Sequence, residues 1–279
     1  MRTYFQKKRY QALLAATTEF SAEELSASAL VVSPHFDDET LGCGGTLLLK
    51  KKAGADLSLV FMTDGSTSHR NLVSPEYLRR VRAAEGREAA KAYGIADRSC
   101  YLLDFPETQL DQQHPAAVKG LLALLEKNRP EQLFLPATAD PLLWSPDHNA
   151  TTRAALEAAK AYGAPLTLVE YPVWFWYHWP WVPYPWRDNY QAGIVGRLSR
   201  SYRLGKSAAV LFNKKVTISE QLKEKRAILG QHRSQMERHP DHPDWQILAD
   251  VAGGEFLNRF FNGHEFFRLY RVNTQGSGK

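Results

Sequence analysis

The sequence is poor in cysteine and lacks long apolar runs. Cys43 and Cys100 are the only cysteines among 279 residues, and neither has the C-x-x-C or Cys/His spacing of a zinc finger. A disulfide scaffold is therefore not expected. No stretch approaches the ~18 apolar residues that a membrane span needs, and the basic N-terminal segment has neither the apolar run nor the cleavage site of a secretory signal. We therefore expect no transmembrane segment and a cytoplasmic protein.

An excess of charge of one sign is also missing. Lys and Arg number 35 against 30 Asp and Glu, and the basic residues are scattered among acidic ones. Because a phosphate backbone is bound by a basic stripe, we expect no nucleic acid partner. The net charge of +5 is compatible with an anionic substrate, with an acidic membrane surface or with solubility alone. The hydrophobic share of 44% is that of a globular protein, and the length predicts one domain spanning residues 1–279.

Short apolar runs alternate with helical segments along most of the chain. Strands are expected at 29–33, 57–63, 100–103, 132–136 and 166–171, and helices at 41–53, 75–93, 115–127 and 146–162. This alternation predicts an α/β fold with a Rossmann-like, mostly parallel sheet and helices on both faces. Residues 215–235 are expected to form a polar helix, and an aromatic strand is expected around 265–270.

Three segments stand apart from this alternation. Residues 1–27 form a basic, partly helical lead-in, residues 171–200 an aromatic insertion or loop, and residues 273–279 a flexible polar tail. The stretch 171–186 holds five of the seven tryptophans and four prolines, which exclude a regular helix. Its rings, Trp176 and Trp179 among them, are suited to stacking on a sugar, but such clusters also form cores and oligomer contacts.

The first segment with chemical potential follows the first strand, in SPHFDDETLGCGGT at 33–46. It places His35, Asp37 and Asp38 at the carboxyl end of a strand, where open α/β sheets present their active-site loops. His35 and Asp38 have a spacing that lets both reach one metal, while Asp37 is placed to act as general base on a metal-bound water. The alternative is that one of the two aspartates only caps the following helix.

The second segment is Ser145-Pro146-Asp147-His148, which has the pattern of a helix start. His148 then lies in the first helical turn, beside the first segment if the strands 29–33 and 132–136 are neighbours. Two imidazole nitrogens and one carboxylate would leave an open position on a zinc ion, as catalytic sites do. A histidine in a first turn is otherwise often a solvated surface residue.

Together these segments resemble the PIG-L/LmbE-like N-acetylglucosaminyl deacetylase family. That family has a His-Pro-Asp-Asp-Glu segment and a later His-Pro-Asp-His segment, which the chain matches at 35–39 and 145–148. Thr63-Asp64-Gly65, Arg82-x-x-Glu85 and His232-x-Ser234-Gln235 match further motifs. The resemblance spans about residues 29–270.

The resemblance implies a zinc-dependent hydrolase that removes the acetyl group from an N-acetylglucosamine-type sugar or glycoconjugate. His35, Asp38 and His148 would be the metal ligands and Asp37 the general base, with Fe²⁺ or another divalent ion also compatible with these ligands. Arg82 and Glu107 would bind the substrate. A homo-oligomer is compatible with the sequence.

Two positions depart from the family pattern. Phe36 stands where proline is usual, and Ser145 replaces a histidine that stabilises the oxyanion in relatives. A serine hydroxyl is a weaker donor, so zinc or another residue would have to take that role. His178, His264 and Tyr177 are candidates.

Other functions compete with this one. The metal core would equally suit a zinc amidase acting on a non-sugar acyl amine, and Ser145 together with the tryptophans suggests a catalytically weak sugar-binding homologue. A nucleotide-binding module is suggested by Gly42-Cys43-Gly44-Gly45, but that spacing is not G-x-G-x-x-G, and the acidic residues at 37–39 would repel a pyrophosphate.

Overall fold

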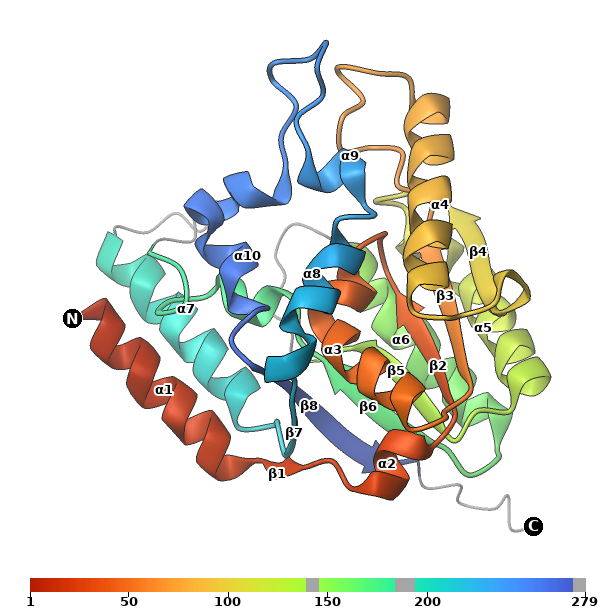
Figure 1. Ribbon diagram of the computed structural model, residues 1–279, viewed down its shortest axis with the longest axis horizontal. Coiled ribbons are helices and arrows are strands. Elements are labelled where there is room, and N and C mark those ends of the chain that lie inside the picture. Colours follow the sequence, from red (N-terminus) through yellow and green to blue (C-terminus); the bar gives the residue numbers. More distant parts are fainter. Residues whose placement is uncertain (139–145, 184–193, 273–279) are drawn as a thin grey trace.

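Five parallel strands, buried between two layers of helices, form the centre of the fold (Figure 1). The computed structural model describes residues 1–138, 146–183 and 194–272. Within them the sheet order is β1-β7-β8-β6-β5-β2-β3-β4. The strands are β1 (Thr18–Glu19), β2 (Ala29–Ser33), β3 (Leu57–Thr63), β4 (Cys100–Phe105), β5 (Gln132–Pro136), β6 (Thr167–Tyr171), β7 (Lys214–Thr217) and β8 (His264–Arg271).

Helices cover both faces of this sheet. They are α1 (Arg2–Ala16), α2 (Ala22–Ser26), α3 (Asp38–Lys52), α4 (Pro75–Ala92), α5 (His114–Asn128), α6 (Pro146–Tyr162), α7 (Ile194–Ala209), α8 (Leu222–Leu229), α9 (Arg233–Met236) and α10 (Glu255–Arg259). None of the described helices is long and apolar enough to cross a membrane.

The strand side chains separate two apolar cores. Along β2, Leu30 and Val32 pack in one core with α5 and α6, whereas Val31 packs in the other with α3 and α4. Every residue of β2 and β3 is buried, because a strand covered on both faces needs apolar side chains on both. The predicted α/β class, with a mostly parallel sheet and helices on both faces, is confirmed.

The edge of the sheet differs from the sequence prediction. Residues 215–235 do not form one helix, because 214–217 are strand β7, which runs antiparallel to β8 and parallel to β1. The helix is limited to α8 and the short α9. Residues 194–200, assigned above to the aromatic insertion, are the first turns of α7. The polar sequence of β7, with only Val216 buried, lacks the apolar run by which the central strands were found.

The aromatic segment is mainly a core element. Residues 174–177 form a single 3₁₀ turn, η3 (Trp174–Tyr177), directly after β6. Trp176 and Trp181 are 4% and 1% exposed, and their rings are in contact with centroids 5.0 Å apart. Trp179 packs on Phe5 of α1. Trp176 and Trp179 therefore do not form an exposed sugar platform, and Trp186 lies outside the described residues.

The glycines at 42, 44 and 45 lie inside α3 and allow close packing. A Cβ on Gly42 would come within 2.1 Å of the Tyr171 ring, and one on Gly45 within 2.6 Å of Ile218. All three glycines are buried, and Cys43 and Cys100 are buried free thiols. This segment is thus an interior helix rather than an open phosphate-binding loop.

The chain order of the strands creates a switch point in the sheet. From β2 the chain continues to β3 and β4 on one side, and then crosses to β5 and β6 on the other. β2 and β5 are therefore direct neighbours, with Leu30 in register with Leu133. In open α/β sheets the crevice at such a point, outside the carboxyl ends of the strands, is where ligands bind.

Candidate metal centre

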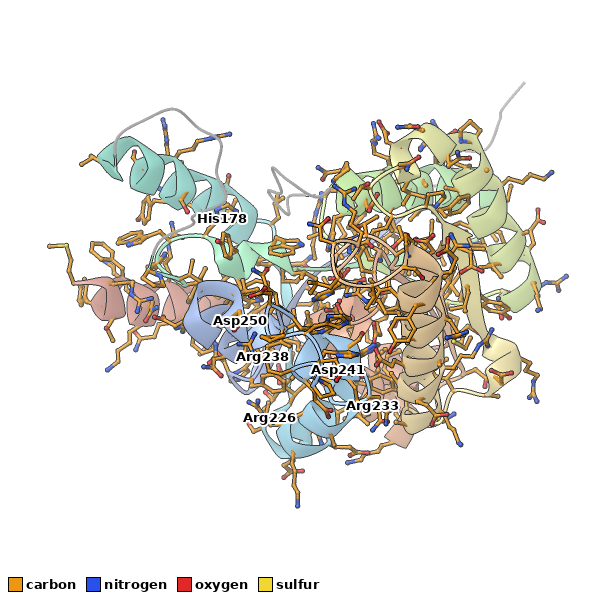
Figure 2. The ribbon with its side chains drawn as sticks, turned by 90° about the horizontal axis from the view of Figure 1, so that it is seen from above. His178, Arg226, Arg233, Arg238, Asp241 and Asp250 are labelled. Atoms are coloured by element: carbon orange, nitrogen blue, oxygen red, sulfur yellow. The ribbon has the colours of Figure 1, made fainter. Side chains whose placement is uncertain are left out.

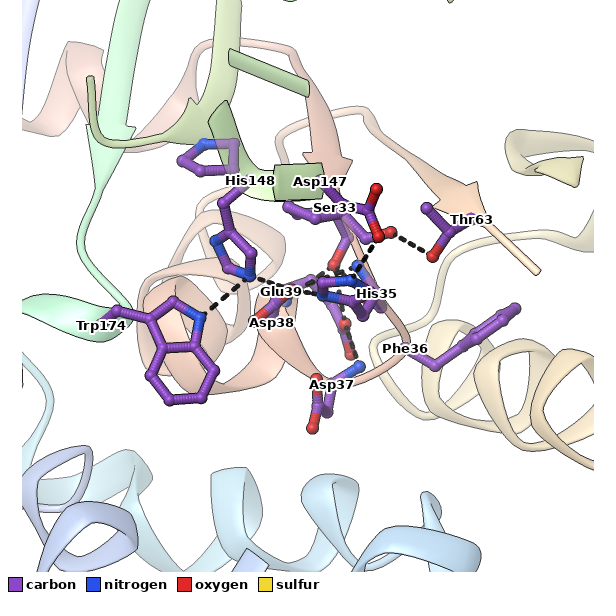
Figure 3. Close-up of polar contacts among 12 residues, drawn as sticks. Ser33, His35, Phe36, Asp37, Asp38, Glu39, Thr63, Asp147, His148 and Trp174 are labelled. Carbon is purple, nitrogen blue, oxygen red and sulfur yellow. Dashed lines mark hydrogen bonds and ion pairs between the residues drawn. The ribbon is translucent and has the colours of Figure 1, made fainter. Parts of the chain in front are cut away.

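The two sequence segments meet at this switch point. His35 and Asp38 follow β2, and His148 lies in the first turn of α6, which follows β5. One side-chain ligand atom from each of the three lies within 4.8 Å of the other two. The Nε2 atom of His148 is 3.2 Å from Oδ2 of Asp38, and Nδ1 of His35 is 3.1 Å from the same oxygen. Figure 3 shows the three side chains pointing toward one another. We call His35, Asp38 and His148 the triad.

Asp147 holds His35 from the other side. Its Oδ2 atom is 3.2 Å from Nε2 of His35 and accepts the backbone N–H of Thr108 at 2.7 Å. Burial favours the neutral carboxyl, but His35 and these N–H groups outweigh it and lower the pKa of Asp147. The sequence motif contained Asp147 but gave it no role. Its position at 0% exposure makes it the residue that orients His35.

Electrostatics inside the triad oppose burial. Burial lowers the pKa of His35, but the carboxylates of Asp147 and Asp38 outweigh it and raise that pKa well above its usual value. Burial likewise favours a neutral Asp38, but His148 and His35 lower its pKa. The two neighbouring imidazoles thus favour the ionised form of Asp38.

Asp37 is held in an unusual conformation next to the triad. It occupies the N-cap position of α3, but its side chain makes no capping hydrogen bond. Its φ angle of 123° lies in the region that residues other than glycine rarely adopt. Its backbone N–H donates to Oε2 of Glu39 at 3.1 Å, and the carboxylate points away from Glu39 in Figure 3. Helix capping therefore does not explain this aspartate.

Burial and like charges act together on Asp37. Burial, followed by the charges of Asp38 and Glu39, raises its pKa well above the usual value, while His35 and Arg82 lower it. A carboxylate with a raised pKa binds a proton more readily than an exposed one, which suits a group that must accept one.

The donor set of the triad fits a divalent cation. It offers two imidazole nitrogens and one carboxylate, the combination found in catalytic zinc sites. Asp37, Asp38, Glu39 and Asp147 are each at most 5% exposed. So many buried carboxylates in one place are costly unless positive charge compensates them. A cation held by the triad would provide that charge.

A cavity of about 440 Å³ lies near this centre. Its wall includes Trp174, Tyr177, Arg82, His69, Gln235 and Asp250. Trp174 belongs to this wall and also donates its indole N–H to Nε2 of His148 at 3.1 Å. Trp174 therefore stands between the cavity and the triad, and no triad residue is among the described residues that line the cavity. Asp250 is ion-paired with Arg238, and Figure 2 shows both side chains near each other, seen from above.

The two residues expected to bind substrate differ in position. Arg82 is 3% exposed, lines the cavity and donates to the hydroxyl of Ser68 at 2.8 Å. None of the ion pairs among the described residues includes Arg82. Glu85, one turn away on the same helix, accepts the N–H and hydroxyl of Ser234. Glu107 accepts the N–H of Thr67 at 2.8 Å and is not among the described residues that line the cavity.

Sequence reasoning missed several residues of this region. Trp174 was one of many aromatic residues in its segment, and nothing local marked it as the one that reaches His148. His69 stacks on Trp245 with ring centroids 3.8 Å apart and closes one wall of the cavity. Because the partners come from loops far apart in the chain, no spacing rule could pair them. Ser145 lies outside the described residues.

The chain is similar to known proteins both in sequence and in fold. Residues 30–159 match the family model PIG-L, described as GlcNAc-PI de-N-acetylase. The diacetylchitobiose deacetylase of Thermococcus kodakarensis is 29% identical over 137 residues, which are 49% of this chain and 50% of that protein. The match thus spans about half the length of this relative.

Two solved structures show the same fold. N,N'-diacetylchitobiose deacetylase from Pyrococcus horikoshii, complexed with its inhibitor MPG, has a TM-score of 0.63 at 20% identity, over 97% of this chain and 92% of that one. The conserved protein TT1542 from Thermus thermophilus has a TM-score of 0.55 at 24% identity, over 86% and 93% of the two chains. At such identities the likeness concerns the fold. The resemblance found in the sequence is confirmed by the family match, and residues 30–159, which match the PIG-L family model, carry the whole triad.

Proposed function

We propose that this protein is a metal-dependent deacetylase that hydrolyses the acetamide of an N-acetylglucosamine-type sugar or glycoconjugate. The observation that carries the proposal is the convergence of His35, Asp38 and His148 around one point, with Asp37 next in the chain and a nearby cavity whose wall includes Trp174. Zinc is the ion that this donor set suits best, and Fe²⁺ is the main competitor. A divalent ion held there would polarise the amide carbonyl and make water a stronger acid.

The protein's own groups supply the proton transfers. We assign the general base to Asp37, whose carboxylate takes one proton from the attacking water. Addition of the hydroxyl oxygen to the acetyl carbon and cleavage of the C–N bond release acetate. The same carboxyl group then returns its proton to the leaving amine nitrogen. None of the hydrogen bonds among the described residues uses the Asp37 carboxylate, which leaves its oxygens available to water and amine.

The remaining site residues position these groups. Asp147 fixes the ring orientation of His35, and Glu39 fixes the backbone of Asp37. Arg82, in the cavity wall, is placed to donate to hydroxyl oxygens of a sugar. For Glu107 we propose a role at the edge of the site. Its carboxylate does not line the cavity, but its charge helps to raise the pKa of His35.

The sugar assignment rests on the cavity and on the relatives. Aromatic and hydrogen-bonding side chains share its wall, as expected for a pocket that accepts a ring with apolar faces and polar edges. The Thermococcus relative is named for diacetylchitobiose, a disaccharide with two acetamido groups. We extend that substrate class, an acetamido sugar, to this chain.

Acetate release from a substrate panel tests the proposal. The panel contains N-acetylglucosamine, diacetylchitobiose, a lipid-linked N-acetylglucosamine and an N-acetylated amine without a sugar. We expect acetate from at least one sugar substrate and much less from the plain amide. The Asp37→Asn variant should lose activity by ~10²-fold or more, the scale of a general base, and should retain the bound metal. Asp38→Asn should lose the metal itself.

A matched control is Asp97→Asn, because Asp97 is an exposed surface partner of Arg87, with a side chain 83% exposed. This variant should keep full activity. Release of acetate from the plain amide alone would instead identify an amidase for other acyl amines. Zinc retention without turnover on any substrate would identify a sugar-binding homologue, and either result would overturn the proposal.

A further inference from the structure

The indole N–H of Trp174 is aimed at the triad. Trp174 is the first residue of η3, three positions after the last residue of β6. Its Nε1 atom donates to Nε2 of His148 at 3.1 Å, and that nitrogen is 3.2 Å from Oδ2 of Asp38 (Figure 3). The indole N–H thus ends at the atoms that would hold the metal.

The bond to His148 and a bound metal exclude each other. A neutral imidazole nitrogen without hydrogen has a single lone pair in the ring plane. That lone pair on Nε2 of His148 either accepts the indole N–H or binds an ion. Nδ1 of His148 is buried without a hydrogen-bond partner among the described residues, so Nε2 is the ring nitrogen that faces both the indole and Asp38. An ion bound at Nε2 would release the indole N–H to donate to another acceptor beside the triad.

The indole is held firmly where it is. Its ring stacks on Phe256 of α10 with centroids 5.0 Å apart and planes 16° apart, and Tyr177 packs edge-on at 6.0 Å. Phe256 is itself only 1% exposed. Such packing restricts the ring to small shifts, so its N–H stays at the boundary between the triad and the cavity that Trp174 lines. A substrate that reaches the triad through this cavity must pass against it.

We propose that Trp174 is a catalytic residue whose indole N–H donates to the carbonyl oxygen of the scissile acetamide as that oxygen becomes an oxyanion. This assignment rests on the proposed function. It would also supply the oxyanion donor that the chain lacks at position 145, where the family resemblance expects a histidine and this chain has Ser145. Two of the other candidates named from the sequence are engaged elsewhere: Nδ1 of His264 is 2.9 Å from the Tyr10 hydroxyl, and Nδ1 of His178 is 3.2 Å from the Ser201 hydroxyl. The third, Tyr177, lines the cavity beside Trp174, but the described hydrogen bonds to the triad include the Trp174 indole and not Tyr177.

The Trp174→Phe variant removes the N–H and keeps an aromatic ring against Phe256. We expect kcat on the best acetamido sugar to fall by ~10²-fold to 10³-fold, the loss seen when one oxyanion donor is removed, with KM changed far less. The zinc content should stay at the wild-type level. The matched control is Trp181→Phe, because the Trp181 indole nitrogen is buried without a partner in the described part of the chain, and this variant should keep wild-type kcat.

A fluorescence titration provides a readout independent of turnover. Zinc added to the metal-free protein should displace the indole from Nε2 of His148. The emission of Trp174 should therefore change in proportion to the amount of zinc bound. That change should disappear in Trp174→Phe and persist in Trp181→Phe.

The outcomes separate the two proposals. If no acetamido sugar releases acetate with the wild type, the proposed function fails and the Trp174 role fails with it. If the wild type is active, any one of three results overturns the Trp174 role alone. These are wild-type kcat in Trp174→Phe, loss of zinc from that variant, and a zinc-dependent emission change in that variant equal to that of the wild type. A rise in KM with unchanged kcat would also overturn it, because it would make Trp174 a binding residue only.

Discussion

His232 and Glu39 form a fully buried pair, with Nε2 of His232 3.0 Å from Oε1 of Glu39, although 193 residues separate them. The second Glu39 oxygen accepts the backbone N–H of Asp37 at 3.1 Å. His232 thus fixes Glu39, and Glu39 fixes Asp37 in its left-handed conformation. Gln235 adds a bond to the carbonyl oxygen of Phe36. The His-x-Ser-Gln motif near the end of the chain therefore holds the loop of the proposed base from behind.

This arrangement makes His232 a positioning residue, and replacement by alanine should lower kcat by ~10-fold to 100-fold, the usual effect of removing an outer partner of a metal site. KM and zinc content should change little. His232→Gln can still donate to Glu39 and should recover part of the rate. His114→Ala is the control, since His114 pairs with Glu157 away from the site. Equal rates for the Gln and Ala variants, with equal losses of unfolding free energy, would reduce His232 to a structural role.

Phe36 and Gly86 should be energetically coupled. A Cβ on Gly86 would lie 2.5 Å from Cδ1 of Phe36 and 3.0 Å from Cε2 of Phe61, too close for any rotamer change to relieve cheaply. Gly86→Ala should therefore lower the free energy of unfolding by ~1–3 kcal/mol through overpacking. Phe36→Leu opens space, so the double variant should lose less than the sum of the two single losses.

Urea unfolding of the two single variants and the double variant measures this coupling. Gly120→Ala is the matched control: it lies inside α5, and its nearest neighbour atom, in Leu103, would be 3.4 Å from the new Cβ. That substitution should stabilise the protein slightly, because alanine is favoured over glycine in a helix. If the losses of unfolding free energy at positions 36 and 86 are additive, the Phe36 ring and Gly86 are not energetically coupled. The same contact explains why phenylalanine is accommodated where the family usually has proline.

The fold and the triad could be predicted because their signals are local. β2 and β3 are continuous apolar runs, and the segments after β2 and β5 contain the ligands in order along the chain. A strand buried on both faces is mostly apolar, so such runs leave few alternatives. The triad needed one further fact, the pairing of β2 with β5, which the sequence only made plausible.

Other parts depended on contacts that no local pattern encodes. β7 has the sequence KKVT, and its strand conformation comes from pairing with β8 at the sheet edge. Trp174 and Trp176 are two residues apart in the same aromatic stretch, yet one lines the cavity and the other packs in the core. Which ring does which depends on the 3₁₀ turn after β6. The Glu39–His232 pair could not be predicted from the sequence either, since each residue alone fits an ordinary polar surface position.

Lys50 should make stability depend on pH in the alkaline range. Its ammonium donates to Oε1 of Gln132 at 2.8 Å, and burial lowers its pKa from 10.5 to about 8, although Glu131 and Glu24 act in the opposite direction. Between these two pKa values the unfolded chain binds more protons than the folded one. The contribution of Lys50 to stability therefore rises with pH across this window. From pH 7.5 to 9.5 the expected gain is on the order of 1–2 kcal/mol.

Urea unfolding at pH 7.5 and 9.5 tests this expectation. Lys50→Met keeps the apolar stem but has no titrating group, so its unfolding free energy should lack the gain seen in the wild type. Lys52→Met changes an exposed lysine on the same helix and should retain the gain. If Lys50→Met and the wild type respond alike, another group is responsible for the alkaline dependence.

Removal of the metal should lower the free energy of unfolding, by an amount set by the free metal concentration at which the protein was saturated. Asp37, Asp38, Glu39 and Asp147 are buried together, so an ion bound by the triad in the folded state alone compensates a charge cost that unfolding would relieve. Zinc at about 100 times its dissociation constant should add about 2.7 kcal/mol to the free energy of unfolding, and a chelator should remove it. Asp38→Asn loses the ligand shared by both histidines, so its melting temperature should not respond to zinc. Asp97→Asn should respond like the wild type. A zinc-dependent rise in melting temperature that persists in Asp38→Asn would place the bound ion elsewhere than at the triad.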